Sequence, residues 1–305
     1  MQLTQNKRRE PFLIEFFCRF FALMCDFGHR LGADNFRFLA ASVLLSALCG
    51  APALYAQQQS GPPAAQSAIS TDRPSITDSS MVVPLGDLLF ENGFDETASQ
   101  GQRSFDFTET LIRYGLTSKT ELRITPPDYF ENYNSTGRFG SGFGDFSLGV
   151  KQQLMVTSEG FNVALILSLS FPTGAKALSS HGYDPEILLP WSHPISRKWM
   201  AAGMFGLLFP TQSGSHNMTG QASFLIDRQL TRKWDAFIEY GGEFPSLGTP
   251  QHIFDTGTTY KIRANQQLDV HFGEGFSGAT PDHFIGFGYS FQFPSLIRRA
   301  ARPAS

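Results

Sequence analysis

The stretch FNVALILSLSFPTG, residues 161–174, alternates between two kinds of side chain. Its odd positions are uniformly apolar, from Phe161 through a valine and leucines to Phe171, whereas most of its even positions are small or polar. Such period-two alternation predicts a β-strand with two unlike faces. The apolar face must pack against a second sheet or contact lipid, and the fold class depends on which of these it does.

The length of this strand favours lipid. Ten residue steps from Phe161 to Phe171 extend about 33 Å. A tilt of about 40° reduces this to a height of about 25 Å, that of the apolar band on an outer-membrane barrel. Strands in β-sandwiches are usually shorter, about five or six residues. Residues 282–293 repeat the pattern, and one of their faces carries Ile285, Phe287, Tyr289, Phe291 and Phe293.

The same texture continues along most of the chain. Alternating segments are predicted near 86–97, 104–115, 119–127, 143–155, 160–171, 185–194, 198–209, 219–230, 234–244, 252–262, 267–276 and 282–293. Short polar turns alternate with longer connections rich in Gly, Pro, Ser and Asn, such as 128–142. This arrangement predicts an all-β fold, a closed antiparallel up-and-down transmembrane β-barrel of about 12 strands, because closure leaves no unpaired edge.

The chain divides into four parts. Residues 1–56 read as a signal or leader segment, because an apolar stretch at 38–56 follows basic residues and ends in small ones, with translation beginning at Met1 or at Met24. Residues 57–70 form a polar linker, 71–293 the β-barrel domain, and 294–305 a C-terminal tail. All three cysteines fall within 1–56, so the predicted mature chain has neither a disulfide nor a cysteine metal site.

Composition excludes several classes of protein. The 305 residues include 30 Phe and 29 Gly, which argues against a disordered chain. The net charge is −3 and no stripe of Lys and Arg is visible, so nucleic acid is not an expected partner. No ATP-binding motif is present, and no cofactor is expected.

Several short motifs occur in an order that resembles an outer-membrane barrel family labelled as a meta-pathway of phenol degradation family, whose members are often described as transporters. The motifs are TDRPSIT (71–77), VPLG (83–86), LIRYGLTSKTELRI (111–124), GFGDFSLGVKQQL (142–154) and LSFPTG (169–174), with the pair Glu91 and Gly93 between the second and third. The resemblance covers roughly residues 70–293. It implies a barrel of about a dozen strands that moves small molecules, aromatic ones among them, across the outer membrane.

Charged residues on the predicted inner faces are candidates for the lumen. They are Arg113, Glu121, Arg123, Asp145, Lys151, Asp235 and Glu239. Opposite charges on adjacent strands can pair. They would then form either a charged constriction that selects solutes or a salt-bridge network that fills a narrow barrel, and both alternatives stay open.

The motif TDRPSIT places Asp72 and Arg73 just before the first strand. One interpretation is a segment that reaches into the lumen or binds at the periplasmic mouth as a plug. The simpler and favoured interpretation is a local turn, in which this Asp–Arg pair fixes the chain.

Catalysis is not expected. The chain has no G-x-S-x-G motif, and its histidines are scattered. Asp282 with His283, and Asp184 with His181, are the best candidates for a metal or proteolytic site, but a metal wants at least three convergent ligands.

The sequence therefore predicts an exported outer-membrane channel or transporter for small, aromatic or hydrophobic solutes. Its expected partners are these solutes, outer-membrane lipid and the barrel-assembly machinery. That machinery often reads a terminal aromatic residue, whereas here Phe293 is followed by the tail 294–305. The alternatives are a barrel enzyme, either a hydrolase or a protease, and a secreted soluble β-rich binding protein.

Overall fold

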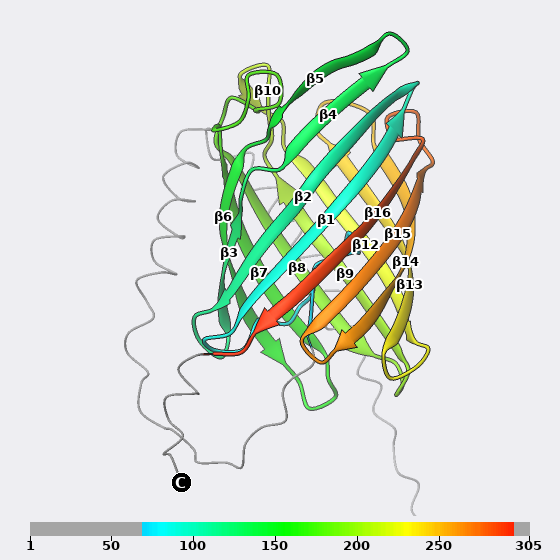
Figure 1. Cartoon of the computed structure of the whole chain (residues 1–305). Coiled ribbons are helices and arrows are strands. Elements are labelled where there is room, and N and C mark those ends of the chain that lie inside the picture. Colours follow the sequence, from blue (N-terminus) through cyan, green and yellow to red (C-terminus); the bar gives the residue numbers. More distant parts are fainter. Residues whose placement is uncertain (1–68, 296–305) are drawn as a thin grey trace, which may run out of the picture. The chain divides into compact units, whose positions relative to one another are not determined.

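A computed structural model describes residues 69–295, which form a closed β-barrel (Figure 1). The predicted leader, most of the linker and the end of the tail lie outside these residues. The strands are β1 (Leu88–Ser99), β2 (Gln102–Gly115), β3 (Thr120–Thr125), β4 (Tyr129–Asn134), β5 (Gly137–Phe143), β6 (Phe146–Val156), β7 (Asn162–Phe171), β8 (Asp184–Pro194), β9 (Trp199–Leu208), β10 (Thr211–Gln212), β11 (Ser215–His216), β12 (Thr219–Gln229), β13 (Trp234–Pro245), β14 (Gln251–Arg263), β15 (Gln266–Gly275) and β16 (His283–Phe293).

Each barrel strand pairs antiparallel with its neighbours, and β1 closes the barrel by pairing with both β2 and β16. The result is the predicted up-and-down transmembrane barrel of twelve strands, so the soluble alternative is wrong for the fold. One end has only short turns, whereas the other carries the long connections together with the tight turns of β1–β2 and β4–β5 (Figure 1). No helix among residues 69–295 is long and apolar enough to cross a bilayer.

The expected loop 128–142 is largely a hairpin, which corrects the sequence prediction. Strand β4 pairs with the upper part of β2 while β3 pairs with its lower part, so the two follow one another in the wall. Strand β5 pairs with β4, and together they extend the wall at the long-loop end (Figure 1). The asparagines of β4 and the glycines of β5 are typical of loops, but the pairing of β4 with β2 overrides that local signal.

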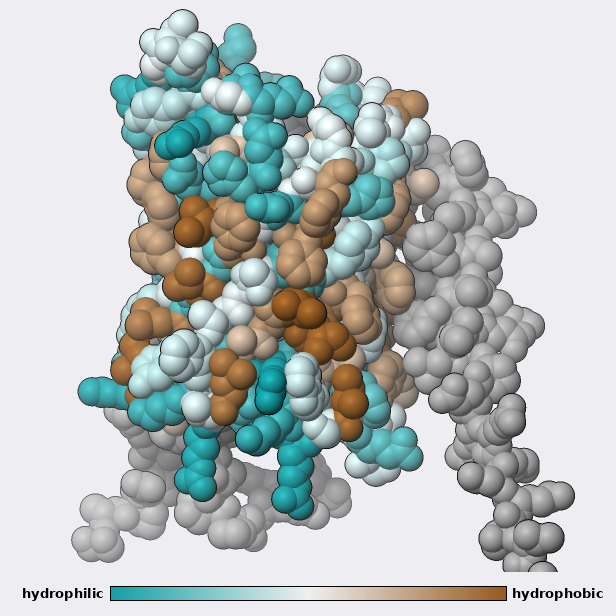
Figure 2. All heavy atoms as spheres, turned by 90° about the vertical axis from the view of Figure 1, so that its right-hand side faces the viewer, coloured by the Kyte–Doolittle hydropathy of each residue, from teal (hydrophilic) through white to brown (hydrophobic). Residues whose placement is uncertain are grey.

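The outer face of the barrel is apolar, as the alternation predicts. Large side chains such as Phe287, Ile238 and Val270 are 59%, 53% and 49% exposed. Figure 2 shows hydrophobic residues over the middle of one side, with hydrophilic residues above and below them. A sheet that leaves such side chains uncovered in water would be unstable, so hydrocarbon is the solvent that this face suits.

Residues 69–87, here called the plug, run through the lumen before β1 begins. The amide of Ile69 donates to the carbonyl of Ala264 in a short turn, and Leu85 bridges Gly115 at the short-turn end of β2. Between these points the segment contacts the inner wall on opposite sides of the barrel. The plug therefore enters and leaves at the short-turn end.

The inner wall is divided by chemistry. Strands β7, β8, β9, β12 and β13 contribute two buried apolar clusters, one of Ile166, Leu188 and Met204 and one of Ala202, Leu225 and Phe237. Buried charged side chains come mainly from β1, β2, β3, β6 and β13–β15. The lumen is thus charged on one side and apolar on the other.

A bulge in β2 decides which of its residues face the lumen. Glu91 pairs with Leu111 and Gly93 with Thr108, so β2 has one residue more than β1 over this interval. Thr108 and Glu109 have positive φ angles of 81° and 27° there. An extra residue reverses the alternation of a strand. From the bulge onward, the odd-numbered residues Glu109, Leu111 and Arg113 therefore face the lumen.

Candidate functional site

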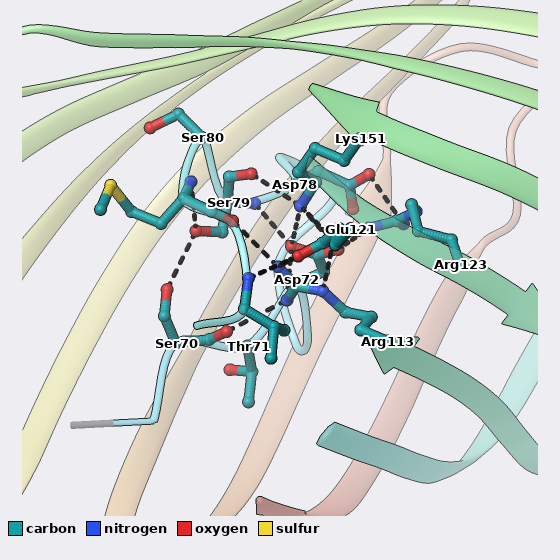
Figure 3. A network of polar contacts seen from close by, with 12 residues as sticks. Ser70, Thr71, Asp72, Asp78, Ser79, Ser80, Arg113, Glu121, Arg123 and Lys151 are labelled. Carbon is teal, nitrogen blue, oxygen red and sulfur yellow. Dashed lines mark hydrogen bonds and ion pairs between the residues drawn. The ribbon is translucent and has the colours of Figure 1, made fainter. Parts of the chain in front are cut away.

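Seven charged residues hold the plug to the wall, and they are called the anchor cluster: Asp72, Asp78, Glu91, Arg113, Glu121, Arg123 and Lys151 (Figure 3 labels all but Glu91). The wall members come from β1, β2, β3 and β6, near the short-turn end. Arg113, Glu121, Arg123 and Lys151 are four of the predicted lumen residues, and the structure brings them together around Asp72.

Arg113 is fully buried and connects the beginning of the plug, at Ser70, with its later part, at Met81. Its guanidinium donates to the carbonyls of Ser70 and Met81 at 3.0 and 2.9 Å. It also donates to Glu121 Oε1 at 2.7 Å and to Glu91 Oε1 at 2.9 Å. The planar fork of arginine suits such multiple donation, so one side chain ties plug and wall into one network.

The wall carboxylates also bind the plug backbone directly. Glu91 Oε2 accepts from the amides of Asp72 and Arg73 at 2.8 and 2.9 Å, and Glu121 Oε2 accepts from the amide of Val83 at 2.7 Å. These bonds satisfy backbone donors of a segment that has almost no secondary structure of its own. The wall carboxylates thereby supply the hydrogen-bond acceptors that a helix or a sheet would supply to these backbone amides.

Asp72 lies at the centre of the anchor cluster. Lys151 Nζ donates to its carboxylate oxygens at 2.8 and 3.0 Å, and Arg113 and Arg123 form ion pairs with it. Burial alone would raise the pKa of Asp72, but these three cations together lower it well below the usual range of an aspartate. Burial and the neighbouring Asp72 raise the pKa of Asp78.

The opposite wall holds the tip of the plug. Glu239 on β13 accepts from the amides of Ile76 and Thr77, each at 2.8 Å. Ser80 and Ser192, on the plug and β8, share a hydrogen bond of 2.7 Å. Glu239 was predicted from sequence to face the lumen, and here it fixes the plug from across the barrel.

Two other predicted residues lie apart from this network. Asp235 faces the lumen near the short-turn end and pairs with Lys261 at 2.8 Å. The lumen position predicted for Asp145 stays a prediction, because the hydrogen-bond partners of Asp145 lie in a long loop. Asp145 precedes β6 and accepts from the amides of Gly174 and Ser180, so it orders a long loop. These hydrogen bonds lower the pKa of Asp145 despite the opposing effect of burial.

The favoured interpretation of TDRPSIT as a turn closed by its own Asp–Arg pair is wrong. Asp72 and Arg73 point to different partners, Asp72 to the anchor cluster and Arg73 to carboxylates further along the barrel. Adjacent residues in an extended segment project to opposite sides, so the two charges separate. The alternative, a segment that reaches into the lumen, describes the structure.

Arg73 enters a second group of charges, here called the acidic pocket: Arg73, Asp95, Glu109, Asp255, Asp269 and His271. Its guanidinium pairs with Glu109 and lies 3.7 Å from Asp95 and 3.6 Å from Asp269. It packs against glycines of the wall, because a Cβ at Gly93 would lie 2.2 Å from its Cζ and a Cβ at Gly288 2.7 Å from its Nε. The motif residue Gly93 is therefore needed for close approach of the plug.

A cavity of about 330 Å³ opens beside Arg73. Its charged and imidazole lining comes from Asp95, Glu109, Asp255 and His271, besides plug residues 72–76 and 78. Its apolar lining includes Leu111 and Phe284. Phe284 is the second residue of β16, and Asp255 and His271 lie four residues from the long-loop ends of β14 and β15. The cavity therefore lies on the side of the plug that faces the long loops.

Sequence reasoning did not select the residues of the acidic pocket. The alternation of β14 and β15 carried a usable signal, because Asp255, Asp269 and His271 each stand between outward apolar or threonine positions. Glu109 carried the same signal when counted from Arg113, because positions 109, 111 and 113 share one face of β2. Within residues 69–295 no group of three or more His, Cys, Asp or Glu side chains has the arrangement of a metal site.

The fold and the plug define a transmembrane barrel of the outer-membrane type with an occupied lumen. The chain belongs to the family described as "Putative MetA-pathway of phenol degradation", whose model matches residues 71–293. This confirms the family that the motifs indicated.

Solved structures are similar in fold. An outer membrane channel from Pseudomonas putida F1 superposes with a TM-score of 0.55 at 14% identity, over 70% of this chain and 98% of that one. The NanC porin has a TM-score of 0.47 at 9% identity, over 67% and 98% of the two chains. The KdgM porin has a TM-score of 0.46 at 12% identity, over 68% and 99%. No curated protein sequence matches this chain.

Proposed function

We propose that this protein is an outer-membrane channel for small solutes whose pathway is closed by its own plug. The observation that carries the proposal is the polar contact between plug and wall throughout the lumen. A small barrel whose interior served stability alone would be filled by its own wall side chains. This barrel instead holds a removable segment of chain, and displacement of that segment would open a path.

The proposed solutes are small molecules with an aromatic or hydrophobic part. The support is the apolar side of the lumen, where Ile166, Leu188 and Met204 lie opposite the charged wall. Pockets for small ligands combine such apolar surface with a few placed polar groups. Export by a cleaved signal peptide, location in the outer membrane and insertion by the barrel-assembly machinery complete the proposal, and catalysis is no part of it.

A disulfide that locks the plug tests the proposal. Residues 69–295 contain no cysteine, and the hydroxyls of Ser80 and Ser192 are 2.7 Å apart across the plug–wall contact. The double variant Ser80→Cys/Ser192→Cys places two thiols where a bond of about 2.05 Å can form with little movement. Single-channel conductance of the purified mature protein, which lacks the three cysteines of residues 1–56, is measured in planar bilayers before and after reduction.

We expect discrete openings from the wild type and from the reduced double variant, and at least a fivefold lower open probability from the oxidised one. The single variant Ser192→Cys is the matched control and should not respond to reductant. Equal conductance of the oxidised and reduced forms would show that the plug is not the gate. Absence of conductance in every form would overturn the channel proposal, and turnover of peptide or lipid by such a sealed barrel would indicate a barrel enzyme.

A further inference from the structure

The acidic pocket contains a buried carboxylate, that of Asp255, whose only ion pair within residues 69–295 is a long one with His271. Asp255 is 0% exposed and lines the cavity, yet neither of its oxygens accepts a hydrogen bond within residues 69–295. Its nearest cationic partner in that part of the chain is His271, whose Nδ1 lies 3.8 Å from Asp255 Oδ2. That separation exceeds hydrogen-bond range. A buried carboxylate compensated only by so long an ion pair is costly, so its retention indicates a ligand that pairs with it more closely.

The charges around Asp255 specify the sign of that ligand. Four carboxylates, those of Asp95, Glu109, Asp255 and Asp269, face one guanidinium and one imidazole. Arg73 is surrounded by three of these carboxylates, and Nε2 of His271 lies 3.2 Å from Asp95. Both basic groups are therefore already engaged, and the remaining charge is negative. A cation suits the cavity and an anion does not.

The rest of the lining specifies shape and polarity. Leu111 and Phe284 from the wall, with Pro74 and Ile76 from the plug, add apolar surface to the lining that includes Asp255. A volume of about 330 Å³ lies at the lower end of the range for small-molecule sites. An aromatic ring such as that of Phe284 also attracts a cation or stacks on a second ring. The combination fits a compact molecule with one ammonium group and an apolar body.

We propose that the acidic pocket binds small organic ammonium ions, with the ammonium on Asp255 and an aromatic or aliphatic body against Phe284 and Leu111. This inference rests on the proposed channel function and names a solute class for it. The plug supplies Arg73 and Ile76 to the same cavity, so a bound ammonium ion contacts plug and wall together. The cavity faces the long loops, which places the site on the entry side of the closed plug.

Two probes of nearly equal shape test the proposal, namely benzylammonium and the neutral benzyl alcohol. Their binding to the purified full-length protein in detergent is measured by isothermal titration calorimetry. We expect benzylammonium to bind at least tenfold more tightly, because hydrogen bonds to a buried charge contribute more than neutral ones. The variant Asp255→Asn should remove this preference. Asp227→Asn should keep it, since Asp227 lies on β12 and does not line the cavity.

Equal affinity for the two probes, or an unchanged preference in Asp255→Asn, would overturn the ammonium site. Heat-dependent mobility on gels verifies that each variant is folded. If Asp255→Asn does not fold, a third variant, Phe284→Leu, tests the proposal instead. Phe284→Leu should weaken benzylammonium at least threefold because the ring contact is lost, and no change would contradict the placement. Conductance without discrimination between probes would refute this site alone, whereas binding without any conductance would refute the channel.

Discussion

The anchor cluster and the acidic pocket lie in the same lumen, both contact the plug, and both are rich in buried charge. They differ in how well those charges are paired. None of the seven anchor residues has a buried polar atom without a hydrogen-bond partner, whereas Arg73, Asp255, Asp269 and His271 all have such atoms. Because buried charges are tolerated when they are paired, the first region is built for stability and the second retains capacity for binding.

The contrast also separates two uses of one segment. Asp72 and Arg73 are neighbours in sequence, and each extends into one of the two regions. A movement of the plug would therefore disturb both. If a ligand binds the acidic pocket in one plug position better than in another, it shifts the equilibrium between those positions by that difference in affinity.

The largest effect is expected from Arg113→Met. The change removes the cation that Asp72, Glu91 and Glu121 share, and leaves buried carboxylates without it. Loss of one partner of a buried ion pair costs about 3–5 kcal/mol. The urea midpoint for unfolding in lipid should fall accordingly. The control Arg103→Met removes an ion pair with Glu96 at a side chain that is 63% exposed, and an equal fall there would contradict the argument.

A somewhat smaller loss is expected from Asp72→Asn. The amide keeps the size of the side chain but removes the negative charge that faces Lys151, Arg113 and Arg123. We expect a destabilisation of about 2–4 kcal/mol and, because the residue lies on the plug, a higher open probability in bilayers. Unchanged gating with lowered stability would show that the cluster holds the barrel and not the plug.

Acid should reduce the difference in the free energy of unfolding between the wild type and Asp72→Asn. The pKa of Asp72 is lowered in the folded protein, so its contribution to stability is present above the unfolded value of about 3.9 and is lost as pH falls towards the folded pKa. Unfolding in urea at several pH values should give a constant gap above about pH 4 and a narrowing gap below it. A gap that stays constant down to pH 2 would refute this charge pairing.

The smallest effect, and one of opposite sign, is expected from Asp255→Asn. The same chemical change as at Asp72 here removes a buried charge that lacks a hydrogen-bonded partner. Without ligand the variant should be more stable by about 1 kcal/mol. Chemical unfolding measures this difference, and destabilisation comparable to that of Asp72→Asn would erase the distinction between the two regions.

Much of the architecture could be predicted from the sequence, because lipid and lumen impose a period of two on every strand. The segments around 161–171 and 282–293 became β7 and β16. Inward positions such as Glu121, Lys151 and Glu239 followed from the same alternation. The prediction failed in the hairpin of β4 and β5, which was expected to be a loop, and it did not include the bulge near Thr108, since local composition does not encode a register shift.

By itself the sequence determined a membrane barrel, its approximate strands and the charged residues on their inner faces. A side chain must match the solvent on its side of a strand, and that requirement is local. Tertiary structure alone decided that 69–87 folds back into the lumen, that Asp72 and Arg73 separate, and that Asp255 lies beside a cavity without a hydrogen-bond partner. These outcomes depend on which strands lie opposite one another in a closed wall, and closure brings together residues far apart along the chain.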